Sequence, residues 1–82
     1  STTFYRNLTI GSKGDDVKKL QQLLNTDIAT RISASGAGSP GNETNYFGNA
    51  TKAAVIKYQQ KNNITPAQGY VGPLTRTKLE GR

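Results

Sequence analysis

The sequence predicts an all-α fold: a compact three-helix bundle with a long loop between helices 1 and 2 and short extended segments before helices 2 and 3. Apolar residues recur at helical spacing in three segments, near residues 12–24, 49–62 and 73–80. The chain has 82 residues, which is enough for one hydrophobic core. We therefore expect a single domain over residues 1–82, with its motifs between residues 8 and 79.

An internal repeat is the most informative feature of the chain. Residues 46–55 and 70–79 both read Tyr, apolar, Gly, two variable positions, Thr, a basic residue, two variable positions and an aliphatic residue. A second pattern, in which Val is followed four and five positions later by Gln, occurs at residues 17–22 and 55–60. The chain is thus built from one small unit used more than once.

The first helix is expected to begin near residues 12–15. Ser12 and Asp15 have the spacing of a capping box, and Asp15 and Asp16 suit the positive end of the helix dipole. The residues predicted to share its apolar face are Val17, Leu20, Leu23 and Leu24.

The segment 26–45 is too long for an ordinary connection between helices. Residues 33–42 are almost all Ser, Ala, Gly, Pro and Asn, so they predict a loop, and loops often carry recognition. Residues 36–41 match the G-x-G-x-x-G spacing of nucleotide sites. No strand leads into them and Pro40 would break a following helix, so we interpret them as a turn-rich loop.

The second helix is expected from Asn49 to about Asn62, directly after Gly48 of the repeat. Thr51 lies three residues past this glycine, where its hydroxyl could reach the free N–H groups of the first turn. The residues predicted to face inward are Thr51, Ala54, Val55 and Tyr58, and those predicted to face outward are Lys52, Lys57 and Lys61.

The third helix is expected from Pro73 to Glu80. Pro fits the first helical position because its φ is already set and its missing N–H would have no partner there. Thr75 follows Gly72 as Thr51 follows Gly48. The expected buried residues are Leu79 with Leu74 or Thr75, and those expected to close the ends of the bundle are Phe4, Leu8, Ile10 and Ile64.

The composition argues against an enzyme and against a metal or cofactor. There is no Cys and no His, which removes disulfides, thiolate ligands, the commonest zinc ligand and the usual general base. The five carboxylates are spread along the sequence without a candidate catalytic pair. No apolar run approaches the ~20 residues that span a bilayer, and we identify no signal peptide in this chain.

The net charge of +6 makes an anionic partner plausible. The eleven Lys and Arg residues are scattered over all three predicted helices and both ends of the chain. No helix carries the cluster expected of a helix that reads base edges, so we do not expect nucleic-acid binding.

The spaced motifs together resemble the peptidoglycan-binding-domain-like family. They are Leu8, Gly11, Gly14, Val17, Leu20, Gln21 and Leu24, then Phe47, Gly48, Thr51, Ala54, Val55, Tyr58 and Gln59, then Gly69, Tyr70, Val71, Gly72, Thr75 and Leu79. The chain departs from the family pattern at Asn45-Tyr46, where the family often has Asp-Gly, and in the length of the insertion 26–45.

The resemblance implies a non-catalytic module that anchors a larger protein to the bacterial cell wall. Its partner would be the peptidoglycan glycan strand or stem peptide, and its location the cell envelope or the secreted fraction. We expect a monomer within a larger multidomain protein. The alternative is a protein–protein interaction or accessory (adaptor) domain of an envelope protein or protease, because a fold does not fix a function.

Peptidoglycan offers sugar rings, amide groups and carboxylates, so a binder needs aromatic faces, hydrogen-bonding groups and a few bases. The two repeat units supply all three beside a helix N-terminus, which favours anions. The candidate site is a shallow groove lined by Tyr46, Asn49, Lys52, Tyr70, Thr75 and Arg76.

Other residues of the repeat are interpreted as structural. The set is Gly48, Thr51, Gln21, Gln59 and Gly72. Thr51 and Thr75 are favoured as helix caps over ligand contacts, and the two glutamines as partners of loop backbone. Tyr70 and Arg76 are expected to face solvent, so that replacing either would change the thermal midpoint little.

Overall fold

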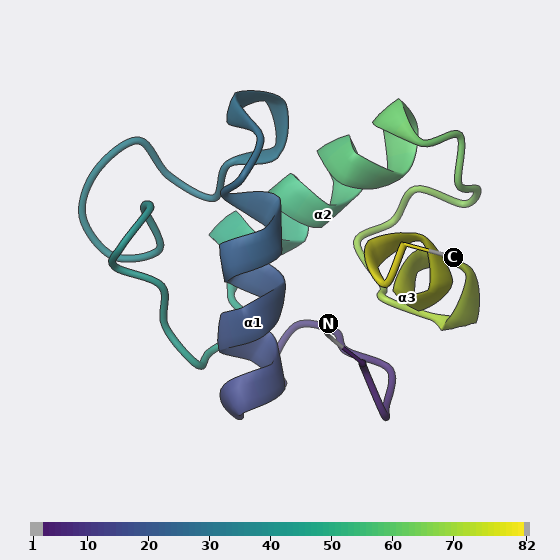
Figure 1. Cartoon of the computed structure of the whole chain (residues 1–82), viewed down its shortest axis with the longest axis horizontal. Coiled ribbons are helices and arrows are strands. Elements are labelled where there is room, and N and C mark those ends of the chain that lie inside the picture. The colour runs from purple at the N-terminus through teal and green to yellow at the C-terminus, as the bar shows by residue number, and fades with distance from the viewer. Residues whose placement is uncertain (1–2, 82) are drawn as a thin grey trace.

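The computed structural model describes residues 3–81, and its elements are α1 (Asp15–Leu24), the short 3₁₀ helix η1 (Ile28–Thr30), α2 (Asn49–Lys61) and α3 (Pro73–Leu79). Figure 1 shows α1 crossing α2, with α3 at one side and the long loop at the other side. The described residues contain three α-helices and no strand, which confirms the predicted three-helix fold.

The segments before α2 and α3 are extended and pair with the N-terminal part of the chain. Leu8 forms an isolated antiparallel bridge with Val71, and Lys13 forms one with Tyr46. In the first bridge Leu8 N donates to Val71 O at 3.1 Å and Val71 N donates to Leu8 O at 2.8 Å. These contacts attach residues 8–13 to both repeat units.

The hydrophobic core draws on all three α-helices and on the segments that precede them. Its buried members are Phe4, Leu8, Val17, Leu20, Leu24, Phe47, Ala54, Val55 and Val71, with Leu23, Ile32, Tyr58 and Leu79 packed against them. Phe47 and Val71, the apolar residues of the two Tyr-apolar-Gly units, are both 0% exposed. The repeat therefore contributes one fully buried side chain just before each of the last two helices. Tyr58, which packs against this core, is partly buried, and this burial raises the pKa of its hydroxyl above the usual value.

One expectation about packing is wrong. Ile10 is 44% exposed, because the chain turns after Leu8 with Ser12 N donating to Thr9 O, and the side chain of Ile10 is carried outward. At the start of α3 the prediction left Leu74 or Thr75 as the buried residue: Thr75 takes that position, and Leu74 is 69% exposed. Phe4 and Leu8 are buried as predicted, and Ile64 is half-buried.

The predicted capping box at the start of α1 is also wrong. The N-cap is Gly14, whose φ of 139° suits glycine, and no side chain caps the helix. Ser12 Oγ instead accepts from Thr9 N at 3.0 Å, while Gly14 N donates to Asn45 O at 2.9 Å. The extended pairing with the segment before α2 thus fixes the helix start. Asp16 lies in the first turn as expected, and the hydrogen bond from Arg6 lowers its pKa.

The long loop is fastened to the end of α1 by one amide side chain. Asn25 Nδ2 donates to Gly38 O at 2.9 Å and to Glu43 Oε2 at 2.8 Å, and Asn25 Oδ1 accepts from Ile32 N at 2.8 Å. The hydrogen bond from Asn25 and further main-chain N–H donors hold the pKa of Glu43 below its usual value. The loop consequently has a defined place beside α1.

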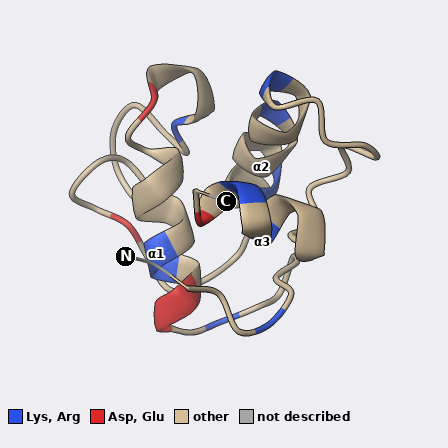
Figure 2. Ribbon diagram, turned by 45° about the vertical axis from the view of Figure 1, so that its right-hand side comes forward, with Lys and Arg blue, Asp and Glu red and all other residues tan. Residues whose placement is uncertain are grey.

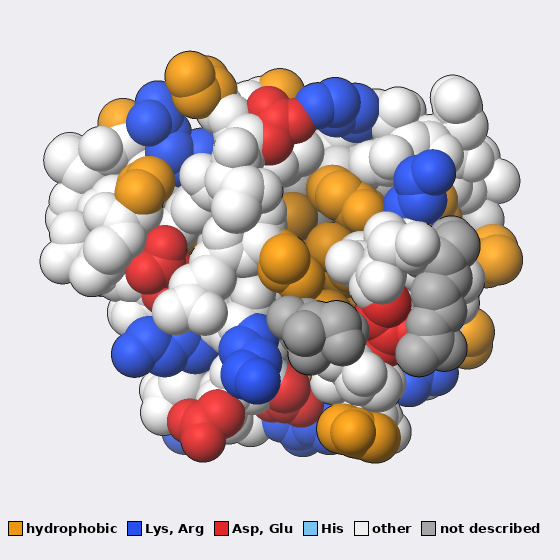
Figure 3. Space-filling model, in the orientation of Figure 1, with side chains coloured by type: hydrophobic (Ala, Val, Ile, Leu, Met, Phe, Trp, Pro, Cys, Tyr) orange, Lys and Arg blue, Asp and Glu red, His pale blue; other side chains and the backbone are white. Residues whose placement is uncertain are grey.

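Charge is spread over the surface. Figure 2 shows Lys and Arg on all three helices and on the N-terminal segment. On the face shown in Figure 3 basic and acidic side chains are interspersed, and some lie side by side. Two pairs, Arg6 with Asp16 and Lys61 with Asp27, form salt bridges at the surface. The positive charge therefore does not define a single basic face in these views.

Candidate functional site

Gln21 of α1 holds together the segment before α2 and the first turn of α2. Its side chain is 1% exposed. Nε2 donates to Tyr46 O and to Thr51 Oγ1, both at 3.0 Å, and Oε1 accepts from Thr44 N at 2.7 Å. We call this set (Gln21, Thr44, Tyr46 and Thr51) the Gln21 frame.

Gln59 of α2 makes the same arrangement one repeat later. It is also 1% exposed. Nε2 donates to Tyr70 O at 2.8 Å and to Thr75 Oγ1 at 3.1 Å, and Oε1 accepts from Gly69 N at 2.9 Å. We call this set (Gln59, Gly69, Tyr70 and Thr75) the Gln59 frame. In both frames one buried amide satisfies main-chain groups that would otherwise be buried without partners.

The predicted capping role of Thr51 and Thr75 is therefore wrong. Neither α2 nor α3 has a side-chain cap, and both threonines are 2% exposed. Their hydroxyls accept hydrogen bonds from the glutamine of the preceding helix. The repeated Thr thus marks where one helix is tied to the next, because its short hydroxyl reaches the buried amide.

Each repeat also places a tyrosine ring over its glycine. A Cβ at Gly48 would lie 3.1 Å from the Tyr46 ring, and one at Gly72 would lie 3.1 Å from the Tyr70 ring. Tyr46 is 49% exposed and Tyr70 is 48% exposed. The glycines let each ring fold back against the main chain while part of the ring stays open to solvent.

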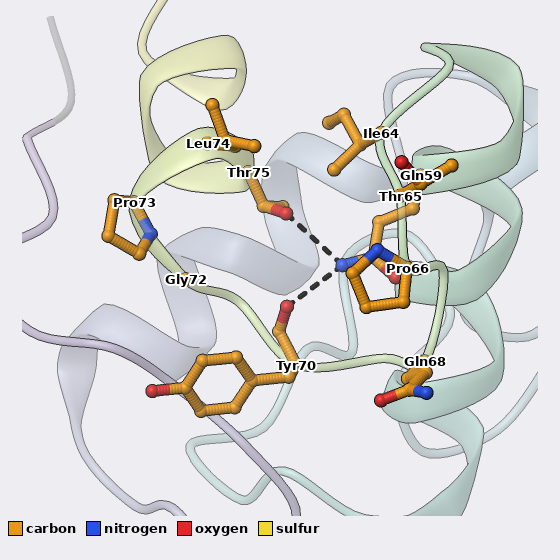
Figure 4. Close-up of a pocket in the computed structure, with 10 residues that line it drawn as sticks. All are labelled: Gln59, Ile64, Thr65, Pro66, Gln68, Tyr70, Gly72, Pro73, Leu74 and Thr75. Carbon is orange, nitrogen blue, oxygen red and sulfur yellow. Dashed lines mark hydrogen bonds between the residues drawn. The ribbon is translucent and has the colours of Figure 1, made fainter.

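The Gln59 frame opens on a hollow of about 230 Å³, which we call the α3 hollow. Figure 4 shows its lining residues, which come from the 64–68 segment, from the Tyr70 segment and from the start of α3. They are Gln59, Ile64, Thr65, Pro66, Gln68, Tyr70, Gly72, Pro73, Leu74 and Thr75. None of them is charged.

The Gln21 frame opens on a second hollow of about 200 Å³, the α2 hollow. Its lining residues are Gln21, Ile32, Ala37, Gly38, Thr44, Tyr46, Gly48, Asn49, Ala50 and Thr51. Part of this wall is the long loop, which Asn25 holds in place. Lys13 Nζ lies 5.9 Å from the centre of the Tyr46 ring.

The six residues predicted to line one groove lie in different places. Tyr46 and Asn49 line the α2 hollow, whereas Tyr70 and Thr75 line the α3 hollow. Lys52 is exposed and lines neither. The described residues therefore present two separate hollows that the repeat relates to one another.

Arg76 lines a third hollow, beside Phe4 and Glu80, and the expectation that it faces solvent is wrong. The residue is half-buried. Its Nη1 donates to Phe4 O at 3.3 Å, while its buried Nε finds no hydrogen-bond partner among residues 3–81. Arg76 contacts the N-terminal segment and contributes to how that segment packs on α3.

Sequence reasoning missed most of the α3 hollow. Ile64, Thr65, Pro66 and Gln68 lie in a short connection that carries no repeat. The available signal was Leu74: once Thr75 and Leu79 are assigned to the inner face of a short helix, Leu74 must project outward. The fold brings this exposed leucine together with Pro66 and Pro73 around the hollow, and it is this grouping that makes an apolar surface.

The described residues offer a limited set of chemical groups. Residues 3–81 hold no group of three or more His, Cys, Asp or Glu side chains placed to take a metal ion. Within the same range no helix has the length and apolar character needed to cross a membrane. What the surface offers is two half-exposed aromatic rings, a set of amides and hydroxyls, and two hollows without charged lining residues.

A scan against family models matches residues 13–79 to the family described as "Putative peptidoglycan binding domain". The chain belongs to this family. No curated protein and no solved structure gave a significant match. The matched region runs from the Lys13–Tyr46 bridge to the last residue of α3, so it includes both frames and both hollows.

Membership of the peptidoglycan-binding domain family indicates binding to peptidoglycan and association with the cell wall. In this peptidoglycan-binding domain the buried glutamines and threonines serve the scaffold. The rings of Tyr46 and Tyr70 are the half-exposed parts of the two repeat units.

Proposed function

We propose that this chain is a non-catalytic peptidoglycan-binding module that anchors a larger protein to the bacterial cell wall, and that it contacts the polymer through the α3 hollow. The observation that carries the proposal is the family match over residues 13–79. We take residues 1–82 as one such module, acting as a monomer within a multidomain protein.

Several features of the α3 hollow support its choice as the contact. It is open at the surface, and the exposed parts of Tyr70 and Leu74 lie at its edge. Aromatic rings bind the C–H faces of sugars, while amides and hydroxyls hydrogen-bond to their polar groups. The α2 hollow offers a tyrosine too, but the long loop forms part of its wall.

Three of the five side-chain carboxylates are engaged by partners away from the α3 hollow. Asp16 pairs with Arg6, Asp27 pairs with Lys61, and Glu43 accepts from Asn25. These partners lower the pKa of each of the three carboxyl groups, whereas a general acid needs a raised one. None of the three lines the α3 hollow.

Co-sedimentation with purified sacculi tests the proposal. Cellulose and DNA serve as control polymers, and the salt concentration is varied. One shallow site buries little area, so we expect weak retention on sacculi that gains strength when the module is repeated or multimerised. Retention on sacculi no greater than on cellulose would contradict the proposal.

The salt series separates specific binding from charge attraction. A site built on ring contacts and hydrogen bonds, with only a few exposed ion pairs worth ~1 kcal/mol each, predicts a shallow dependence on salt. Attraction of the +6 chain to an anionic polymer by counterion release would lower affinity by about 10³-fold or more between roughly 50 and 200 mM salt. A slope of that size on sacculi would overturn the α3 hollow as the contact.

A further inference from the structure

The α3 hollow is uncharged although the chain carries a net charge of +6. Its ten lining residues include no Lys, Arg, Asp or Glu. An ionised group that entered it would lose hydration without gaining an opposite charge, which is unfavourable. The hollow therefore selects a neutral part of the polymer. Stem peptides carry free carboxylates, so the glycan strand is the better fit.

The walls of the hollow are more apolar than a plain sugar requires. Figure 4 shows Ile64 and Pro66 on one side and Pro73 and Leu74 on the other, with Tyr70 and Gln68 along a third edge. A plain sugar is ringed by hydroxyls that need partners, and aliphatic walls provide none. An acetamido group adds a methyl for the aliphatic walls and one amide for polar contact.

The α3 hollow has few polar groups, and most of them already form hydrogen bonds within the protein. Gln59 and Thr75 bond to each other within the frame. The Tyr70 hydroxyl already accepts from Asn7 Nδ2 at 2.7 Å. The exposed groups left over include the Thr65 hydroxyl and the Gln68 amide. One amide and one hydroxyl match the needs of a single acetamido group.

The hollow is small and preorganised. Its volume of about 230 Å³ is below the roughly 300–1,000 Å³ of pockets for drug-sized ligands, so it has room for about one substituted ring. The three hydrogen bonds of Gln59 fix the main chain at residues 69 and 70 and the first turn of α3. A wall held in this way loses little freedom when a ligand enters.

We propose that the α3 hollow recognises an N-acetylated amino sugar of the glycan strand, with the acetamido methyl against Pro66, Pro73 and Leu74. The acetamido group hydrogen-bonds at the rim, where Gln68 and Thr65 lie. This assignment rests on the proposed function and names the part of peptidoglycan that the site reads.

A titration with two neutral trisaccharides tests the assignment. The ¹⁵N-labelled chain is titrated with the β1–4 trimer of N-acetylglucosamine and with the β1–4 trimer of glucose, which has the same length and linkage. We expect the acetylated trimer to bind at least about tenfold tighter, with amide shifts centred on residues 64–75. Equal affinities, no binding of the acetylated trimer, or shifts centred on the α2 hollow would each overturn the assignment.

Two exposed aliphatic residues give a matched pair of variants. Leu74 is 69% exposed in the hollow, and Ile28 is 80% exposed on η1, outside it. Neither supports the core, so both alanine variants should fold. Leu74→Ala should weaken binding of the acetylated trimer by about fourfold or more and reduce its preference over the glucose trimer, and Ile28→Ala should change neither. An unchanged preference in Leu74→Ala would contradict the assigned wall.

Re-acylated sacculi separate failure of this assignment from failure of the proposed function. Sacculi are de-N-acetylated and then either re-acetylated or formylated, which keeps the amide and removes only its methyl. Stronger retention on the acetylated form, by about fourfold, supports the assignment. Equal retention on both overturns it while leaving peptidoglycan binding in place. Retention on neither the re-acylated nor the native sacculi overturns both proposals.

Discussion

The two frames have nearly the same hydrogen bonds but open on unlike hollows. In each, a buried glutamine donates to a tyrosine carbonyl and to a threonine hydroxyl, and accepts from a main-chain N–H. The α2 hollow has the long loop in its wall, whereas the α3 hollow is bounded by prolines and aliphatic side chains. The shared positions of the repeat therefore specify the scaffold, and its variable positions together with residues outside it specify the chemistry of each surface.

The tyrosines show that the difference does not come from the shared positions of the repeat. Their exposed fractions are 49% for Tyr46 and 48% for Tyr70, and each ring lies over its own glycine. What differs is the neighbour of each ring: Lys13 near Tyr46, and Asn7 at the hydroxyl of Tyr70. Equivalent rings in unlike surroundings provide an internal control for binding experiments.

The largest expected effect tests whether the frames are equivalent in stability. Gln59→Ala and Gln21→Ala each leave buried main-chain groups and a threonine hydroxyl without partners and create a cavity. We expect each to lower the free energy of unfolding by about 3 kcal/mol. Chemical denaturation measures both. If one variant loses less than about 1 kcal/mol, its glutamine is not needed to hold its frame and the equivalence fails.

The next effect tests which of the two hollows binds peptidoglycan. Tyr70→Ala removes the ring at the edge of the α3 hollow, so retention on sacculi should fall by about tenfold. Tyr46→Ala removes an equally exposed ring from the α2 hollow and should leave retention unchanged. The control is thermal unfolding of both variants, which should show that each remains folded. Equal losses in the two variants would mean that both hollows bind.

The basic residues at matching repeat positions should differ in stability. Arg76 is half-buried and donates to Phe4 O, whereas Lys52 is exposed. We expect Arg76→Ala to reduce the free energy of unfolding by about 1 kcal/mol, because its packing and its hydrogen bond are lost. Lys52→Ala should stay within about 0.5 kcal/mol of the parent. The opposite ranking would show that the half-buried position of Arg76 contributes nothing.

The smallest expected effect is the pH dependence of stability that comes from Glu43, the long-loop residue hydrogen-bonded to Asn25. The pKa of Glu43 is lowered from 4.5 in the folded state, so the unfolded chain binds the proton first as the pH falls. The stability that this carboxylate contributes is present above pH 4.5 and is lost as the pH falls through the folded value. Asp16 and Asp27, lowered from 3.8, act in the same direction at lower pH.

Glu43→Gln isolates this contribution. Its thermal midpoint should fall less steeply than that of the parent between about pH 5 and pH 3, since one titrating group has been removed. Differential scanning fluorimetry across the pH range compares the two. A steeper fall in the variant would contradict the sign of the Glu43 shift.

The three helices could be predicted from the sequence because the apolar residues that face the core recur at helical spacing. Val17, Leu20 and Leu24 recur on one face of α1, and Pro73 marks the start of α3. The periodic pattern depends only on which residues face the core. The helix caps predicted from local sequence were wrong. The hydroxyls of Thr51 and Thr75 accept hydrogen bonds from Gln21 and Gln59 instead of capping their helices. Ser12 does not cap α1, because residues 11–14 pair with residues 45–47.

The candidate site was predictable only in part. The repeat drew attention to Tyr46 and Tyr70, and their half-exposed rings follow from the glycines beside them. It also suggested one shared groove, because sequence similarity does not reveal that each unit faces its own hollow. Pro66 and Gln68 carry no periodic signal, and only the fold brings their connection against the start of α3.

The claim that peptidoglycan binds at the α3 hollow is tested most directly by mapping the contact. Soluble peptidoglycan fragments that carry both glycan and stem peptide are titrated into the ¹⁵N-labelled chain, and amide shifts are followed for every assigned residue. The account predicts saturable shifts centred on residues 64–75, with residues 44–51 unchanged. Shifts centred on residues 44–51, or spread over the lysines of all three helices, would contradict it.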